Sequence, residues 1–259
     1  MSIVNTLTLE SNRQIKINFD GGDLSSDAGL LLIKEFAAKI GFTKLIKKKF
    51  KTNDEAVRFH KDAENLLQMI YQVISAYFQD DCADELTLDP VFLAVLGKES
   101  LASQPTLSRF FNRMDEDTLV QFNDIDKKLR DIIYSIKRPE HVLFDLDSTL
   151  FGTYGRQEGE GFNFHYQAHG YHPLLCYDGL TGDLLKAELR NGTLHCSNGS
   201  DKFMESIFQE YLERGLKTYL RGDSGFSSPK LYETCESNGC SLSRHLEEKS
   251  FTNCKYASV

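Results

Sequence analysis

The sequence lacks the long hydrophobic runs that membrane insertion and secretion require. No stretch of about 18 or more consecutive apolar residues occurs, which argues against a transmembrane helix. The N-terminal segment has no basic region followed by an apolar core, so it does not resemble a secretory signal. We therefore expect a chain that works in the cytoplasm.

Cysteine motifs are missing as well. The cysteines include no C-x-x-C pair, and a chain of 259 residues can bury a core without disulfide bonds. No neighbouring base is recognisable that would activate one of them as a nucleophile. The sequence therefore predicts reduced thiols without a catalytic role. They are Cys82, Cys176, Cys196, Cys235, Cys240 and Cys254.

Two clusters of metal-ligating residue types lack the spacing of a known site. The acidic stretch 80–85 has neither the spacing nor the turn glycine of an EF-hand, which favours a solvated loop. His165, His169 and His172 would not all face one side if they lay on strands, and Cys176 is the only nearby thiol. A zinc site is therefore less favoured than polar hairpin positions.

The charge balance gives no clear indication of nucleic-acid binding. The formal net charge is −8, which by itself argues against a nucleic-acid partner. Basic residues are nevertheless clustered at 44–51 and 127–138. Such clusters can bind phosphates locally, although a solvated helix face is the common alternative.

The first half of the chain, residues 1–138, is expected to be mainly helical. Alternating residues around 10–12 predict an N-terminal β-hairpin, and apolar residues at helical spacing follow it. The clearest helix has Asp62 as its expected N-cap. Helices are predicted at about 27–40, 43–50, 62–78, 90–97, from 105 onwards and at 115–136.

The pattern changes to short strands after Pro139. Apolar runs at 142–147, 162–168, 173–177 and 184–189 are separated by glycine-containing turns, which is typical of antiparallel hairpins. A helix at 202–214 then leads to a strand at 218–223, and a second helix begins at Pro229. Because a helical crossover favours parallel pairing, we expect the 218–223 strand beside the 142–147 strand.

Two aspartates stand at the ends of these two strands. Asp147 ends the first strand and Asp223 ends the second. If the strands are adjacent and parallel, both carboxylates emerge at the same edge of the sheet. Carboxylate oxygens are preferred ligands of Mg²⁺, so the pair predicts a divalent-metal site.

One resemblance starts from the first of these strands. Asp145-x-Asp147-x-Thr149-Leu150 looks like the first motif of haloacid dehalogenase-like phosphatases. It implies Asp145 as the nucleophile and Asp147 as the acid/base. The acid that this family places after its last motif is absent here, because 227 and 228 are serines.

A second resemblance covers most of the chain. Asp147-Ser148-Thr149, the hairpins and helix that follow, and the glycine-containing turn at Asp223 are similar to the DDE (group 1) transposases of bacterial insertion sequences. The similarity runs from about residue 20 to 240. Further matching stretches are 25–30, 101–110, 151–155, 168–175, 179–182 and 221–226.

This resemblance implies an α/β, RNase H-like catalytic core that cuts and joins DNA. In the family, three acids (D-D-E) hold two Mg²⁺ or Mn²⁺ ions, and Asp147 and Asp223 match the first two acids. The expected partners are double-stranded DNA, both transposon ends and target, and a second copy of the chain. The expected location is the bacterial cytoplasm, at the nucleoid.

The end of the sequence departs from the family pattern. The third acid of the family is a glutamate well beyond the second, whereas 241–259 is polar and its match fades. The expected domains are therefore a helical region (1–138), an RNase H-like core with an incomplete sheet (139–240) and a divergent tail (241–259). A C-terminal truncation would leave the activity impaired, or leave a DNA-binding remnant without catalysis, unless Glu247 or Glu248 substitutes.

Four basic residues on the predicted helices are candidate DNA-binding residues. Lys47 and Lys48 belong to the first basic cluster, and Arg109 and Arg113 are expected on the outer side of the helix after Pro105. We expect them to contact phosphates and to give weak, salt-sensitive binding.

Overall fold

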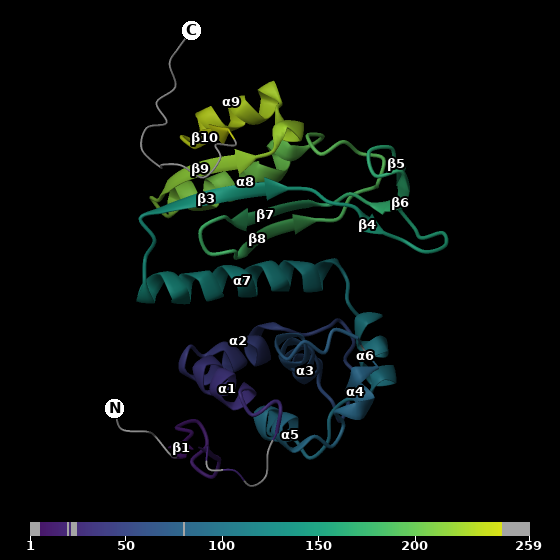
Figure 1. Ribbon diagram of the computed structural model, residues 1–259, viewed down its shortest axis with the longest axis vertical. Helices are drawn as coiled ribbons and strands as arrows, with labels where there is room; N and C mark the ends of the chain where they lie inside the picture. Colours follow the sequence, from purple (N-terminus) through teal and green to yellow (C-terminus); the bar gives the residue numbers. More distant parts are fainter. Residues whose placement is uncertain (1–5, 20, 22–24, 80, 245–259) are drawn as a thin grey trace. The chain divides into compact units, whose positions relative to one another are not determined.

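The computed structural model describes residues 6–19, 21, 25–79 and 81–244. It divides into two compact units, Met1–Ile136 and Lys137–Val259, each with its own architecture (Figure 1). Among the helices of the described residues, none combines the length and the apolar character that a bilayer crossing needs.

The first unit is mainly helical, as the sequence predicts. An antiparallel hairpin precedes the helices, with Leu7 opposite Ile17. Its elements are β1 (Thr6–Thr8), β2 (Lys16–Asn18), α1 (Leu30–Lys39), α2 (Phe42–Lys49), α3 (Asp62–Ile74), α4 (Cys82–Glu85), α5 (Pro90–Leu96), α6 (Gln104–Phe111) and α7 (Glu116–Ile136).

Two groups of buried side chains hold this unit together. One joins the hairpin to α1, α3 and α5 and includes Leu30, Tyr71 and Phe92. The other joins α2, α3, α6 and α7 around Phe50 and Phe110, whose rings meet edge to face at 5.9 Å. Each buried large side chain contributes about 2 kcal/mol, so these groups are the main source of stability in the unit.

Helix α3 ends earlier than its apolar pattern suggests. The stripe of apolar residues continues to Phe78, but the helix ends at Ile74. Ala76 has a positive φ of 65°, which breaks the helical hydrogen-bond pattern. Phe78 is consequently exposed on the surface instead of packing on a helix face.

The second unit is a mixed sheet with helices and a small side sheet. Its elements are β3 (His141–Asp147), β4 (Phe151–Gly152), β5 (Gly161–Asn163), β6 (Ala168–Tyr171), β7 (Leu174–Asp178), β8 (Leu184–Glu188), α8 (Ser200–Glu213), β9 (Lys217–Gly222), the 3₁₀ turn η1 (Ser224–Phe226), α9 (Pro229–Ser237) and β10 (Ser241–Arg244).

The main sheet has the strand order β10-β9-β3-β7-β8. β3, β7 and β8 form an antiparallel meander, and β9 and β10 are added in parallel. The predicted parallel pairing of the first and last strands around the helical crossover is confirmed, with His141 opposite Lys217 and Leu146 opposite Gly222. This α/β arrangement is consistent with the RNase H-like fold.

The fifth strand was not expected from the sequence. β10 lies in a polar stretch that the resemblance treats as the start of a divergent tail, yet Leu242 is opposite Leu220 of β9. An edge strand needs hydrogen bonds on one side only and tolerates polar side chains, so a single leucine is enough to orient it. The sheet therefore continues past residue 240.

One face of the sheet is covered by helix α8. Phe144 of β3 is fully buried, with its ring 5.7 Å from that of Phe208 and 5.0 Å from that of Tyr211. Leu146 and Leu220 are buried on the same face. This packing fixes β3 and β9, and hence the residues at their ends.

The strand predicted over 162–168 is interrupted by a turn at 164–167, which separates β5 from β6. The Asn163 side-chain oxygen accepts hydrogen bonds from the backbone N–H groups of His165 (3.0 Å) and Tyr166 (3.1 Å). Gln167 adopts a positive φ of 53°. Asparagine stabilises turns in this way, so β5 and β6 form a hairpin, and β4 completes the small sheet β4-β6-β5.

Candidate active site

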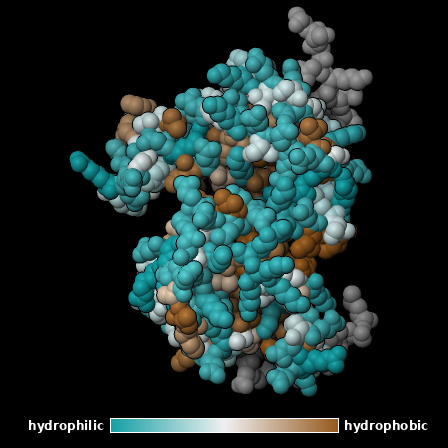
Figure 2. All heavy atoms as spheres, turned by 180° about the vertical axis from the view of Figure 1, so that it is seen from behind, coloured by the Kyte–Doolittle hydropathy of each residue, from teal (hydrophilic) through white to brown (hydrophobic). Residues whose placement is uncertain are grey.

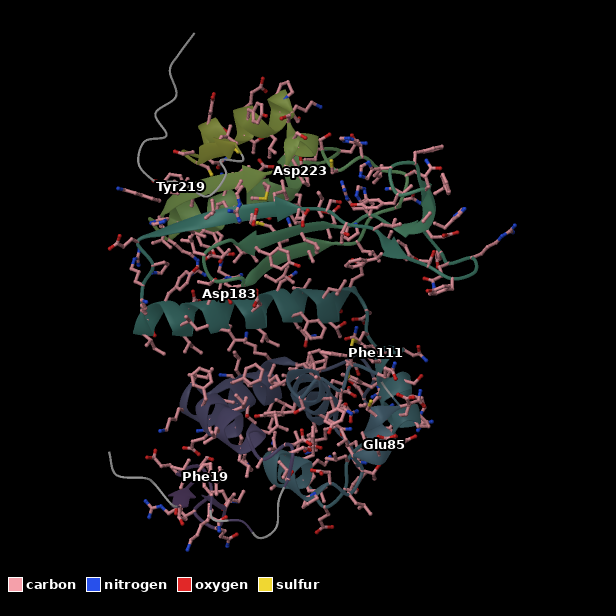
Figure 3. The ribbon with its side chains drawn as sticks, in the orientation of Figure 1. Phe19, Glu85, Phe111, Asp183, Tyr219 and Asp223 are labelled. Atoms are coloured by element: carbon pink, nitrogen blue, oxygen red, sulfur yellow. The ribbon has the colours of Figure 1, made fainter. Side chains whose placement is uncertain are left out.

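Strand pairing places the two predicted acids at the same edge of the sheet. Leu146 is opposite Gly222 in the parallel ladder, and Asp147 and Asp223 are the next residue on each strand. Asp223 keeps an extended backbone (φ −70°, ψ 177°) before the chain enters η1. Adjacent strands lie about 4.8 Å apart, so the two backbones leave the sheet side by side. Figure 3 labels Asp223 at this end of β9.

Each acid is held by a backbone hydrogen bond that leaves carboxylate oxygen available. Asp147 Oδ1 accepts from the Ser148 N–H at 2.7 Å, and Asp223 Oδ1 accepts from the Gly225 N–H at 2.8 Å. Both residues are exposed. Neither forms an ion pair with any residue in the described ranges. The remaining carboxylate oxygens of both residues are open to solvent.

The turn after Asp223 requires glycine at one position. A Cβ atom on Gly225 would lie 2.6 Å from Cys196 Sγ and 3.0 Å from Asp223 Oδ1. Cys196 is therefore a neighbour of the acid that sequence reasoning missed. Burial raises the pKa of the Cys196 thiol and the negative charge of Asp223 adds to this effect. The same thiol lies 3.6 Å from Nδ1 of His195, an imidazole neighbour that the sequence analysis did not recognise.

Asp145 is engaged by an arginine that sequence reasoning also missed. Arg221 lies directly opposite Asp145 in the β3–β9 ladder. Its Nε donates to Asp145 Oδ1 at 3.0 Å and its Nη2 donates to Oδ2 at 2.5 Å. This hydrogen bonding raises the pKa of Arg221. The sequence does contain a signal for this pairing. Asp145 lies two residues before Asp147 and Arg221 lies two residues before Asp223, so parallel pairing of the two strands places them opposite each other.

The Asp145–Arg221 pair argues against the phosphatase interpretation. That interpretation needs Asp145 as a free nucleophile, but both of its oxygens accept hydrogen bonds from one guanidinium. A bidentate pair of this kind is among the stronger side-chain contacts. Side chains two residues apart on a strand share a face. The ion pair therefore lies on the same face of the sheet as Asp147, two residues further from the end of the strand.

An apolar cavity of about 340 Å³ lies beside Asp223. Its wall is formed by residues of β3, β9, η1, α9 and the edge strand β10, together with Asp223. The lining residues are Leu146, Leu220, Gly222, Asp223, Ser224, Phe226, Ser227, Leu231, Tyr232 and Leu242.

The acid pair fits a divalent cation, but it is not a complete ligand set. Two unpaired carboxylates at one sheet edge are the donor type that Mg²⁺ and Mn²⁺ prefer. Across residues 6–19, 21, 25–79 and 81–244, no group of three or more His, Cys, Asp or Glu side chains is arranged to hold a metal ion. Asp80, Glu247 and Glu248 lie outside these ranges.

Three of the four predicted DNA-binding residues are exposed, and one is not. Lys47 and Lys48 on α2 and Arg109 on α6 are exposed. Arg113 does not point outward as expected. Its side chain is 13% exposed and its Nη2 lies 2.6 Å from Asp62 Oδ1, because Asp62 at the start of α3 supplies a counter-charge. Its other terminal nitrogen donates to the Arg109 carbonyl at 2.9 Å.

Comparisons with known proteins support the transposase resemblance. The family model "Transposase DDE domain group 1" matches residues 7–253, further than the stretch of 20–240 on which the resemblance rested. No curated protein matches the chain.

Among solved structures, one similarity is to a chain of the simian T-cell lymphotropic virus intasome in complex with PP2A regulatory subunit B56 gamma. The TM-score is 0.27 and the identity 14%, over 42% of this chain and 32% of that chain. This similarity is too low to carry an argument, and the aligned part spans about a third of that chain's length. The family match spans nearly the whole sequence, so the chain belongs to the group 1 family of DDE transposases.

Proposed function

We propose that the protein cleaves and transfers DNA strands at insertion-sequence ends in a reaction that needs a divalent metal ion. The observation that carries this proposal is the pair Asp147 and Asp223, which follow directly on paired residues of adjacent parallel strands. Both carboxylates lack a cationic partner within the described residues, so they are suited to hold Mg²⁺ or Mn²⁺.

The chain's own residues would hold and position the reacting groups. Asp147 and Asp223 would hold the metal, which in such sites polarises an attacking oxygen and stabilises the charge on the leaving 3′ oxygen. Arg221 neutralises Asp145 next to the site. This leaves two negative charges for the metal to compensate, and it keeps Asp145 from competing for the ion.

A third carboxylate is needed for full activity. Two-ion sites in this family use three acids, and octahedral Mg²⁺ tolerates incomplete ligand sets poorly. We propose that strand transfer by this chain is impaired unless Glu247 or Glu248 takes that place. The last described residue, Arg244, is opposite Gly222 in the β9–β10 ladder, and only three peptide bonds separate it from Glu247.

The partners would be double-stranded DNA and a second copy of the chain. Transposition joins two ends of an element to a target, so two active sites acting together are the expected assembly. We propose the bacterial cytoplasm, at the nucleoid, as its location, because that is where such a DNA substrate lies. A DNA-binding remnant without catalysis is the alternative, and nicking activity separates the two.

The test is nicking of a supercoiled plasmid that carries the terminal repeats of the element. We expect open-circle product with Mg²⁺ or Mn²⁺ and none with EDTA. Mn²⁺ should give the higher yield, because it accepts less regular coordination. DNA binding without any nicking under either metal would contradict the enzymatic proposal and favour a DNA-binding remnant without catalysis. Hydrolysis of a generic phosphate monoester would instead favour the phosphatase alternative.

DNA binding by the helical unit should depend on salt and on three basic side chains. We expect affinity to fall steeply between about 50 and 200 mM salt, and each of Lys47→Ala, Lys48→Ala and Arg109→Ala to reduce the slope of log K against log salt by about 1. Lys49→Ala is the matched control, since Lys49 on the same helix is paired with Asp124 at 2.9 Å. Binding that does not change over this salt range would contradict the assignment.

A further inference from the structure

The small sheet forms an arm attached at the catalytic end of the main sheet. We call residues 151–171 the aromatic arm; it contains β4, β5 and β6. The chain enters it just after Asp147, and it returns to β7, where Leu175 is opposite Asp147. The Ser148 hydroxyl donates to the Pro173 carbonyl at 2.7 Å, which links the segment that enters the arm to the segment that leaves it. Figure 1 shows the arm extending beyond the end of β3.

The two faces of the arm differ in their chemistry. One face is made of glycine backbone: Gly170 is opposite both Gly152 and Gly161. A Cβ on Gly170 would lie 2.2 Å from the Phe151 carbonyl oxygen, and one on Gly192 would lie 2.3 Å from the Gly170 carbonyl oxygen. The segment around Gly192 therefore packs directly on this face and closes it.

The opposite face carries aromatic side chains. Phe151 is opposite Tyr171, and Phe162 is opposite His169. The Phe162 ring lies 5.2 Å from the rings of both Phe164 and His169. Among the described residues, Phe151 and His169 on this face are exposed, and Phe162 and Tyr171 are half-buried.

Aromatic side chains in the loops of the arm are exposed as well. Tyr154 is 96% exposed and Phe164 is 77% exposed, and Phe151 and Tyr166 are exposed as well. In Figure 2 the arm projects from the molecule with hydrophobic side chains on its surface. No leucine, isoleucine, valine or methionine occurs from 151 to 172. The exposed large apolar side chains of the arm are therefore all aromatic. Its charged side chains are Arg156 and Glu158, which are exposed, and Glu160, which is half-buried.

Flat rings next to a DNA-cleaving centre match the chemistry of unpaired bases. Aromatic side chains stack on bases of any sequence, because every base has a π-face. A phosphate held at Asp147 and Asp223 lies beside the base of the arm, because the arm begins four residues after Asp147. We propose that the aromatic arm holds unpaired DNA bases beside the cleaved phosphate, with Tyr154 and Phe164 as the stacking platforms. This rests on the proposed function.

The absence of tryptophan allows a direct test in the full chain. Tyr154→Trp keeps a ring at the position and introduces a single fluorescent reporter. Titration with a 20-nucleotide oligodeoxythymidine should quench its emission, and a blunt duplex of equal length should quench it less. Tyr154→Ala and Phe164→Ala should each weaken binding of the single strand about 5- to 100-fold. Phe78→Ala, at a ring that is 74% exposed in the helical unit, should leave it unchanged.

The outcomes separate this inference from the proposed function. Quenching by the single strand without metal-dependent nicking would support base binding by the arm and contradict the proposed DNA-cleaving function. If the chain nicks DNA but both alanine variants bind the single strand unchanged, the proposed role of the arm is wrong and the proposed function stands. Equal quenching by duplex and single strand would also overturn it. A loss of self-association in the same variants, without loss of DNA binding, would show that the rings contact a second copy instead.

Discussion

Replacing Asp147 or Asp223 by asparagine should reduce metal-dependent nicking by at least about 100-fold. Asparagine keeps the size of the side chain and its ability to accept the backbone hydrogen bond from Ser148 or Gly225. It removes the negative charge that a divalent cation requires. The fold should therefore survive, and the loss should appear in nicking of the plasmid and not in the thermal midpoint.

Two other aspartates serve as matched controls. Asp183 is exposed in the turn between β7 and β8, at the opposite end of the main sheet (Figure 3), and Asp183→Asn should retain full activity. Asp145→Asn should retain activity to within about tenfold, because Asp145 is assigned to an ion pair and not to the metal. Complete loss in Asp145→Asn with survival of Asp223→Asn would contradict the site and favour the phosphatase interpretation.

Reversing the charge of Arg221 should be the second most damaging change. Arg221→Asp would place two carboxylates opposite each other on β3 and β9, each two residues before Asp147 or Asp223. Like charges in direct opposition weaken strand pairing, and the extra carboxylates would compete for the metal ion. We expect nicking to fall about 10- to 100-fold, measured at saturating Mn²⁺ so that weaker affinity and slower turnover can be separated.

The double variant Asp145→Arg/Arg221→Asp tests whether the pair itself matters. It restores opposite charges across the same pair of positions, so activity should recover to within about tenfold of the unchanged chain. A double variant that is no more active than Arg221→Asp would show that Arg221 acts by another route.

The strand framework was predictable because local pattern and topology agree. The apolar runs of β3 and β9 were visible in the sequence, and the crossover rule gave their parallel pairing, which brings Asp147 and Asp223 to one edge. β10 was not visible, because an edge strand with Leu242 as its central apolar residue carries no hydrophobic pattern. The break between β5 and β6 depends on one asparagine side chain, which periodicity does not register.

Contacts between distant segments account for the other differences. Arg113 was expected to face solvent from its helical spacing, but the spacing of one helix contains no information about Asp62 on another. The Asp145–Arg221 pair is likewise a property of register and not of either strand alone. The exposure of the aromatic arm is equally hidden in the sequence, because it depends on which face of the small sheet packs against the segment around Gly192.

A crystal structure of the chain with Mn²⁺ tests the central claim most directly. The account predicts one ion, visible by its anomalous signal, bound by Asp147 and Asp223, whose carboxylates should lie within about 4–8 Å of each other. Carboxylates on opposite faces of the sheet, or more than about 12 Å apart, could not share one hydrated ion. That result would contradict the metal site and the DNA-cleaving function that depends on it.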